Sequence, residues 1–206
     1  SSYHGLQTNL THRPAKGLVF QVAYTWSKSM DNGSSVGNEA SESSNTSAQP
    51  WAFCTSCQKG RSDFDIPHNL VANFQYELPV MEAVKKSTLA NGILGGWQIG
   101  GIYIRQSGSH FSVKDGGDQA GTGSSVANTA SGGQRPMYVA GAGCTPGAAP
   151  GDIYGLYINT SCIGFPGPGV LGNLGRNTYS MPVFRNFDFS VFKNQNLWGE
   201  KLKAQF

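Results

Sequence analysis

The residues that could carry chemistry in this chain lie in segments without regular hydrophobic periodicity. The segment Gly33–Gly37 reads Gly-Ser-Ser-Val-Gly and follows a strand-like stretch, so it matches the Gly-x-Ser-x-Gly pattern of a nucleophilic serine. That chemistry requires a helix after the serine and a histidine base oriented by an acid, whereas Ser-rich sequence follows here. The segment Gly167–Gly172 matches Gly-x-Gly-x-x-Gly, but no strand and helix surround it, and Pro168 favours a turn. We therefore predict no catalytic residue, no cofactor site and no enzyme activity.

Three further side chains, Asp63, Asp65 and His68, are candidates for binding a hard cation. Carboxylates two residues apart can converge on one cation when the backbone is irregular. Such residues more often cap turns and pair with a nearby cation, for which Arg61 is available. We favour this ion pairing and predict no metal site.

Four cysteines fall as two pairs within polar, irregular segments: Cys54 with Cys57, and Cys144 with Cys162. This arrangement indicates disulfides formed in an oxidising compartment. A redox-active pair at Cys54 and Cys57 would need a helix N-terminus to lower the thiol pKa, so a local structural disulfide is favoured. A bond between Cys144 and Cys162 would close a loop in a Gly-rich region. Pairing across the two segments stays open, because four cysteines allow three connectivities.

The element that organises the chain is the stretch Leu18–Met30, in which large apolar residues alternate with polar ones. Side chains of a strand point alternately to its two faces, so this pattern predicts a strand with one apolar and one polar face. Such a strand suits a boundary between hydrocarbon and water. No apolar run approaches the length of a membrane-spanning helix.

The same alternation recurs along the chain. We expect strands near residues 5–13, 18–30, 69–78, 97–106, 183–193 and 201–206, with long loops at 31–68 and 107–182. Short and long connections therefore largely alternate, which is typical of outer-membrane barrels with short periplasmic turns and long extracellular loops. The predicted fold class is all-β: the chain is an antiparallel transmembrane β-barrel segment and part of one β-barrel domain.

Strand parity assigns the side chains to two surfaces. We expect the following to face lipid or form an aromatic girdle: Phe20, Tyr24, Trp26, Phe74, Tyr76, Trp97, Tyr103, Phe187 and Phe189. The following are expected to face the lumen: Gln21, Thr25, Asn73, Gln75, Asn186 and Asp188.

Charged residues make up only 13% of the chain and the net charge is +3 without a basic run, so nucleic acid is not an expected partner.

Five segments together resemble one family: Thr25–Asn32 (TWSKSMDN), Ser62–Leu70 (SDFDIPHNL), Tyr76–Pro79 (YELP), Gly95–Gly108 (GGWQIGGIYIRQSG) and Gly172–Asn194 (GNLGRN…FRNFDFSVFKN). In this order they are similar to the C-terminal half of the barrel of Oar-like TonB-dependent outer-membrane receptors. The resemblance implies a barrel of about twenty-two strands, about six of them from this chain, closed by an internal plug. It also implies energy supply by a TonB-type complex of the inner membrane, and it transfers no catalytic residue.

The expected function is thus energised transport of a bulky solute across the outer membrane of a Gram-negative bacterium. Its expected partners are outer-membrane lipid, the plug of the same full-length chain, the TonB-type complex and an unknown cargo. Two alternatives are a surface adhesin or structural barrel, and a secreted carbohydrate-binding β-sandwich. The sandwich predicts that Phe20, Val22, Phe74 and Phe189 are buried in a core.

Overall fold

The computed structural model describes residues 1–13, 17–34, 56–117, 119–121, 134–141, 143–144, 158–196 and 203–206. The chain divides into two compact units. The first, here called the loop unit, consists of Ser1–Gly5, Ser27–Pro67 and Ser107–Val183. The second, here called the strand unit, consists of Leu6–Trp26, His68–Gln106 and Phe184–Phe206.

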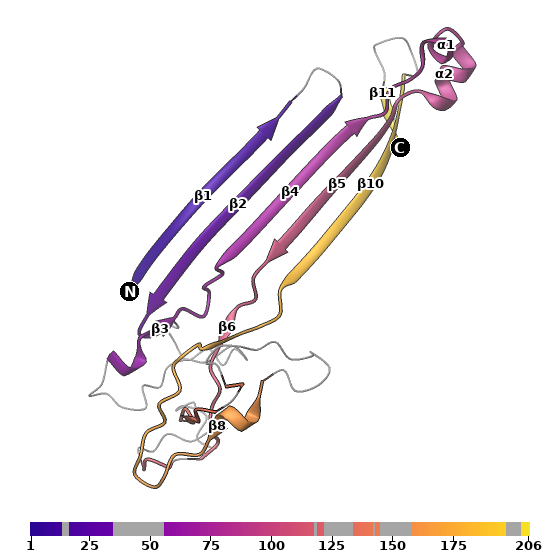
Figure 1. Cartoon of the computed structure of the whole chain (residues 1–206). Helices are drawn as coiled ribbons and strands as arrows, with labels where there is room; N and C mark the ends of the chain where they lie inside the picture. Colours follow the sequence, from indigo (N-terminus) through magenta and orange to yellow (C-terminus); the bar gives the residue numbers. More distant parts are fainter. Residues whose placement is uncertain are drawn as a thin grey trace. The chain divides into compact units, whose positions relative to one another are not determined.

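The long strands form one sheet in which neighbours in the chain are neighbours in space (Figure 1). In sheet order they are β1 (Ser2–His12), β2 (Leu18–Asp31), β4 (His68–Glu77), β5 (Trp97–Gln106), β10 (Phe184–Asn196) and β11 (Lys203–Gln205). Every pairing from β2 to β11 is antiparallel. This up-and-down order is the connectivity of simple β-barrels.

These six strands correspond in order to the six that alternation predicts. The ends differ by a few residues: β1 begins earlier, at Ser2, and β10 continues to Asn196. The extension of β10 is explained by its partner, because Asn194 and Asn196 pair with β11. Hydrophobic periodicity does not predict this extension, because its residues are polar.

Two short helices that the sequence analysis did not anticipate occupy the connection between β4 and β5. They are α1 (Glu82–Lys85) and α2 (Thr88–Leu94). Ser87 caps α2, because its side-chain oxygen accepts a hydrogen bond from the Ala90 amide at 3.4 Å. Gly96, with φ of 73°, turns the chain into β5 in a conformation that other residues seldom adopt. Helices this short show too little periodicity to be recognised from sequence.

The loop unit contains short pairings and turns. β3 (Gly60–Arg61) pairs with the end of β2, β6 (His110–Phe111) with β9 (Tyr179–Ser180), and β7 (Met137–Tyr138) with β8 (Ile163–Gly164). The described residues also form two 3-10 turns, η1 (Ser56–Gln58) and η2 (Thr160–Cys162). The described parts of the two segments expected to be long loops therefore contain short backbone pairings.

The distribution of buried side chains differs from that expected for a β-sandwich. Among the described residues, the buried hydrophobic side chains are Cys162, Leu174 and Tyr179, all in the loop unit. In the strand unit Phe189 is 58% exposed, and Phe20 and Phe74 are only half-buried. The burial that the sandwich alternative predicts for these side chains is therefore not found in the strands that the structure describes. No described helix has the length and apolar character needed to cross a membrane.

Candidate functional site

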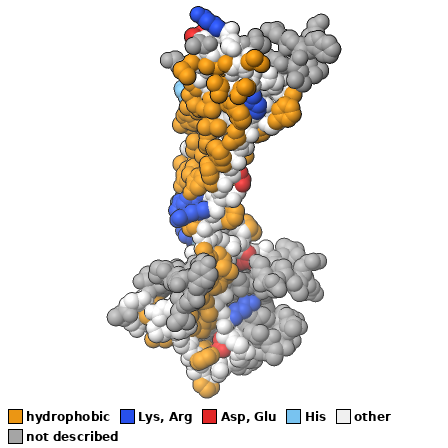
Figure 2. Space-filling view, turned by 90° about the vertical axis from the view of Figure 1, so that its right-hand side faces the viewer, with side chains coloured by type: hydrophobic (Ala, Val, Ile, Leu, Met, Phe, Trp, Pro, Cys, Tyr) orange, Lys and Arg blue, Asp and Glu red, His pale blue; other side chains and the backbone are white. Residues whose placement is uncertain are grey.

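The sheet register determines which side chains share a face, because directly paired residues of an antiparallel sheet point to the same side. One face, here called the apolar face, consists of four rows across β2, β4, β5 and β10. These rows are Tyr24–Leu70–Arg105–Arg185, Val22–Ala72–Tyr103–Phe187, Phe20–Phe74–Gly101–Phe189 and Leu18–Tyr76–Ile99–Val191. Figure 2 shows hydrophobic side chains gathered along the strands. All nine side chains predicted to face lipid have the parity of this face, with Trp26 and Trp97 at its two ends.

The opposite face, here called the polar face, carries amide, hydroxyl and carboxylate groups among aliphatic ones. Its rows are Thr25–Asn69–Gln106–Phe184, Ala23–Val71–Ile104–Asn186, Gln21–Asn73–Ile102–Asp188 and Val19–Gln75–Gly100–Ser190. All six side chains predicted to face the lumen lie here. A hollow of about 310 Å³ opens where Gly100 leaves space beside Asn73, Gln75 and Ser190.

Amphipathic side chains mark both ends of the apolar face. At one end the hydroxyl of Tyr24 is hydrogen-bonded to Nδ1 of His68 at 2.8 Å. At the other end the Lys193 ammonium lies 5.3 Å from the centroid of the Trp97 ring. From His68 along β4 to Leu78, whose backbone amide donates to the Trp97 backbone oxygen, the chain advances by ten residue steps. At about 3.3 Å per residue and a tilt of about 40°, this corresponds to about 25 Å, the height of the apolar band of outer-membrane barrels.

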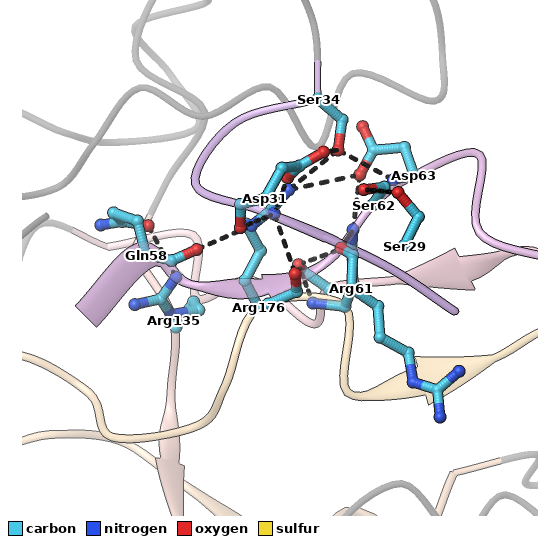
Figure 3. A network of polar contacts seen from close by, with 12 residues as sticks. Ser29, Asp31, Ser34, Gln58, Arg61, Ser62, Asp63, Arg135 and Arg176 are labelled. Carbon is cyan, nitrogen blue, oxygen red and sulfur yellow. Dashed lines mark hydrogen bonds and ion pairs between the residues drawn. The ribbon is translucent and has the colours of Figure 1, made fainter. Parts of the chain in front are cut away.

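A second candidate site is a buried polar network in the loop unit, centred on Arg176 (Figure 3). Arg176 is only 4% exposed. Its guanidinium forms an ion pair with the Asp31 carboxylate and donates to the backbone oxygens of Asp31 and Gln58, at 2.7 and 3.0 Å. It also donates to the Ser34 hydroxyl at 3.1 Å. One arginine near the end of the chain thus joins the end of β2 to the segment that precedes β3.

Asn177 extends the same network. Its backbone adopts a left-handed conformation with φ of 51°, which asparagine tolerates better than most residues. From this position its side-chain amide donates to the Asp63 carboxylate at 2.5 Å and to the Arg61 backbone oxygen at 2.7 Å. Its backbone amide donates to the Ser112 hydroxyl at 2.8 Å. Both loops therefore contribute to one hydrogen-bonded cluster.

Asp65 organises the adjoining part of the loop unit. Its buried carboxylate accepts a hydrogen bond from the Ser29 amide at 2.7 Å and pairs with Arg61 at 2.9 Å. His110 Nε2 lies 3.5 Å from the same carboxylate and 3.2 Å from the Arg61 guanidinium. The Ser29 and Ser62 hydroxyls are bonded to each other at 2.9 Å. The negative charge of Asp65 is thus balanced within the protein.

The network shifts the pKa values of its members. Burial acts to raise the pKa of Asp31, but hydrogen bonds from Ser62, Ser34 and Arg176, together with the Arg176 charge, lower it below its usual value. Burial of the His110 ring and the charge of Arg61 lower the pKa of His110, partly opposed by Asp65. Both shifts favour an anionic aspartate and a neutral histidine near neutral pH.

The three candidate cation ligands each have another partner. Asp63 accepts from Asn177, Asp65 pairs with Arg61, and His68 is bonded to Tyr24. In the part of the chain that the structure describes, no group of three metal-ligating side chains gathers. The ion pair expected with Arg61 is the one that Asp65 makes.

The described cysteines are disulfide-bonded. Cys144 and Cys162 are joined by a disulfide that spans 18 residues. Cys57 is disulfide-bonded as well, whereas Cys54 lies outside the described residues. Near Cys57, Arg135 donates to its backbone oxygen and to the Gln58 side chain, both at 2.9 Å. These contacts hold the cysteine-containing turn in the loop unit.

Sequence reasoning did not assign a role to Arg176 or Asn177. Their partners lie far away in the chain, because Asp31 precedes Arg176 by 145 residues. The one signal available was their place in GNLGRN, a segment quoted above for its resemblance to a family.

A single antiparallel sheet with one mainly apolar face and one more polar face is the arrangement found in the wall of a transmembrane β-barrel. The model of the outer membrane beta barrel domain family matches residues 1–206. The chain belongs to this family, and its antiparallel strands are a segment of an outer-membrane β-barrel. Neither the comparison with curated proteins nor that with solved structures found a match.

Proposed function

We propose that this domain is part of the barrel of an Oar-like TonB-dependent receptor, which transports a bulky solute across the outer membrane of a Gram-negative bacterium. The observation that supports this proposal is the meeting of three resembling segments in one network. Asp31 belongs to TWSKSMDN, Asp63 and Asp65 to SDFDIPHNL, and Arg176 and Asn177 to GNLGRN. The three segments that carry the sequence resemblance therefore also contact one another in the structure.

In the proposed mechanism the loop unit captures cargo, and the barrel wall stays static. Loops held in one arrangement lose less conformational freedom when a ligand binds, which raises affinity. The polar face would line the lumen, where Gln21, Asn73 and Gln75 offer amide donors and acceptors to a plug from the same full-length chain. Plug rearrangement, driven by a TonB-type complex, would then open the path. No side chain is assigned a catalytic role.

The test uses cells that produce the full-length protein. Mass spectrometry would compare depletion of solutes from the medium between these cells and matched cells without the receptor. We expect at least one solute to be depleted only when the receptor, the TonB-type complex and a proton gradient are all present. A control variant lacking the TonB-contacting segment should insert into the outer membrane normally and deplete nothing.

Two outcomes would contradict the proposal. Depletion that persists without the TonB-type complex or the proton gradient indicates a passive channel. If no solute depends on the receptor, but attachment of the cells to a surface or to other cells does, the protein is an adhesin. The second result would favour the alternative in which the long loops bind a matrix.

A further inference from the structure

Two arginines lie directly opposite each other on the apolar face. Arg105 of β5 pairs with Arg185 of β10, and Leu70 of β4 is the next residue in the same row. Cβ atoms of directly opposed residues are about 5 Å apart, and like charges on directly opposed residues are destabilising. An anion bound between the two cations would remove this repulsion.

Among the residues that the structure describes, none supplies such an anion. Both side chains are exposed, and neither forms an ion pair or a hydrogen bond with any residue that the structure describes. The acidic residues of β4 and β10, Glu77 and Asp188, have the parity of the polar face. Two guanidinium groups are therefore presented on one surface without a carboxylate partner from the described strands.

The surface next to this arginine pair is hydrophobic. The adjoining row of the same face contains Tyr103 and Phe187, and the row after it contains Phe74 and Phe189. Phe187 and Phe189 are 56% and 58% exposed, with their ring centroids 6.4 Å apart. A ligand that fits both parts has an anionic head and an apolar tail.

We propose that Arg105 and Arg185 bind the phosphate of a phosphorylated membrane lipid, whose acyl chains lie along the aromatic rows beside them. Guanidinium groups bind phosphate oxygens through paired, charge-assisted hydrogen bonds, and two of them can share one phosphate. The phosphate removes the repulsion between the cations, while the chains cover apolar surface that would face hydrocarbon. This inference depends on the apolar face contacting lipid in the outer membrane, and it does not depend on the proposed transport.

The test measures lipid binding to the purified full-length protein in detergent by native mass spectrometry. The probes are lipid A, which is the phosphorylated glycolipid of outer leaflets, dephosphorylated lipid A, and inorganic phosphate. We expect lipid A to bind, dephosphorylated lipid A to bind at least about tenfold more weakly, and inorganic phosphate not to compete at millimolar concentration. Arg105→Gln and Arg185→Gln should each weaken lipid A binding about tenfold. Lys86→Gln, which removes an exposed cation outside the sheet, should leave it unchanged.

Thermal stability provides a second readout, which separates binding from damage to the fold. In lipid-free detergent Arg185→Gln should raise the melting temperature slightly, because it removes the repulsion from Arg105. With lipid A present the same variant should lose the stabilisation that the unsubstituted protein gains. Equal binding of both lipids, or unchanged binding by both variants, would overturn the proposal. Competition by inorganic phosphate would identify a site for free phosphate and would overturn the lipid assignment.

Discussion

Replacing Arg176 by methionine tests the central claim about the loop unit. Methionine keeps much of the length and the apolar stem of arginine but removes its charge. The change leaves the Asp31 carboxylate, in a residue only 8% exposed, without its cation, and Gln58 loses the donor to its backbone oxygen. Removing one partner of a buried ion pair typically costs 3 to 5 kcal/mol. Because the Ser34 hydroxyl still donates to Asp31, we expect about 3 kcal/mol.

Hydrogen exchange of the full-length protein in detergent measures this cost locally. The Ser62 amide donates to the Ser29 backbone oxygen at 3.1 Å, so it reports whether the network is closed. A loss of about 3 kcal/mol in opening free energy accelerates exchange about 150-fold when exchange requires opening. Peptides from β10, in the strand unit, should exchange as in the unsubstituted protein.

Lys59→Met is the matched control, because Lys59 lies in the same unit but is exposed and forms no ion pair with a described residue. A change at such a surface position is typically within about 0.5 kcal/mol, so exchange should change less than about threefold. In a double-mutant cycle, Asp31→Asn together with Arg176→Met should cost less than the sum of the single changes. Equal effects of Arg176→Met and Lys59→Met, or no effect of Arg176→Met, would refute the assignment of Arg176 as the centre of the network.

Three further predictions concern the rest of the chain. Burial lowers the pKa of His110 in the folded protein. The loop unit should therefore be fully stable above the ordinary pKa of 6.5 and should lose stability as the pH falls below that value. In the His110→Gln variant, hydrogen exchange of the loop unit should depend less on pH. Replacing Cys144 and Cys162 by serine opens an 18-residue loop and should destabilise it by about 3 kcal/mol, measured as faster proteolysis within the loop unit; a cleavage rate equal to that of the unsubstituted protein would contradict this. In outer-membrane vesicles a cysteine at Phe187 should react only with a lipid-soluble label and one at Asn186 only with a water-soluble label, whereas equal labelling of both would contradict the two-faced sheet.

Much of the strand unit could be predicted from sequence, because apolar and polar residues alternate along its strands and this alternation determines which side chains share a face. In Leu18–Met30 the period of two sets the strand and both of its faces, and the same holds for β4. The family match then identifies the domain without any catalytic or metal-binding signature. The helices α1 and α2 escaped prediction because one or two turns carry too little periodicity.

The sequence by itself determined that the sheet has one apolar and one polar face. The alternation that sets these faces lies within each strand and does not depend on which strand it pairs with. What only the tertiary structure decided is which polar residues meet. The pairing of Arg176 with Asp31, and the placement of Arg105 opposite Arg185, depend on contacts between residues 145 and 80 positions apart in the chain. No periodic pattern encodes such contacts, because the loops around Arg176 lack regular alternation and the register of β5 against β10 is set by the whole strand pair.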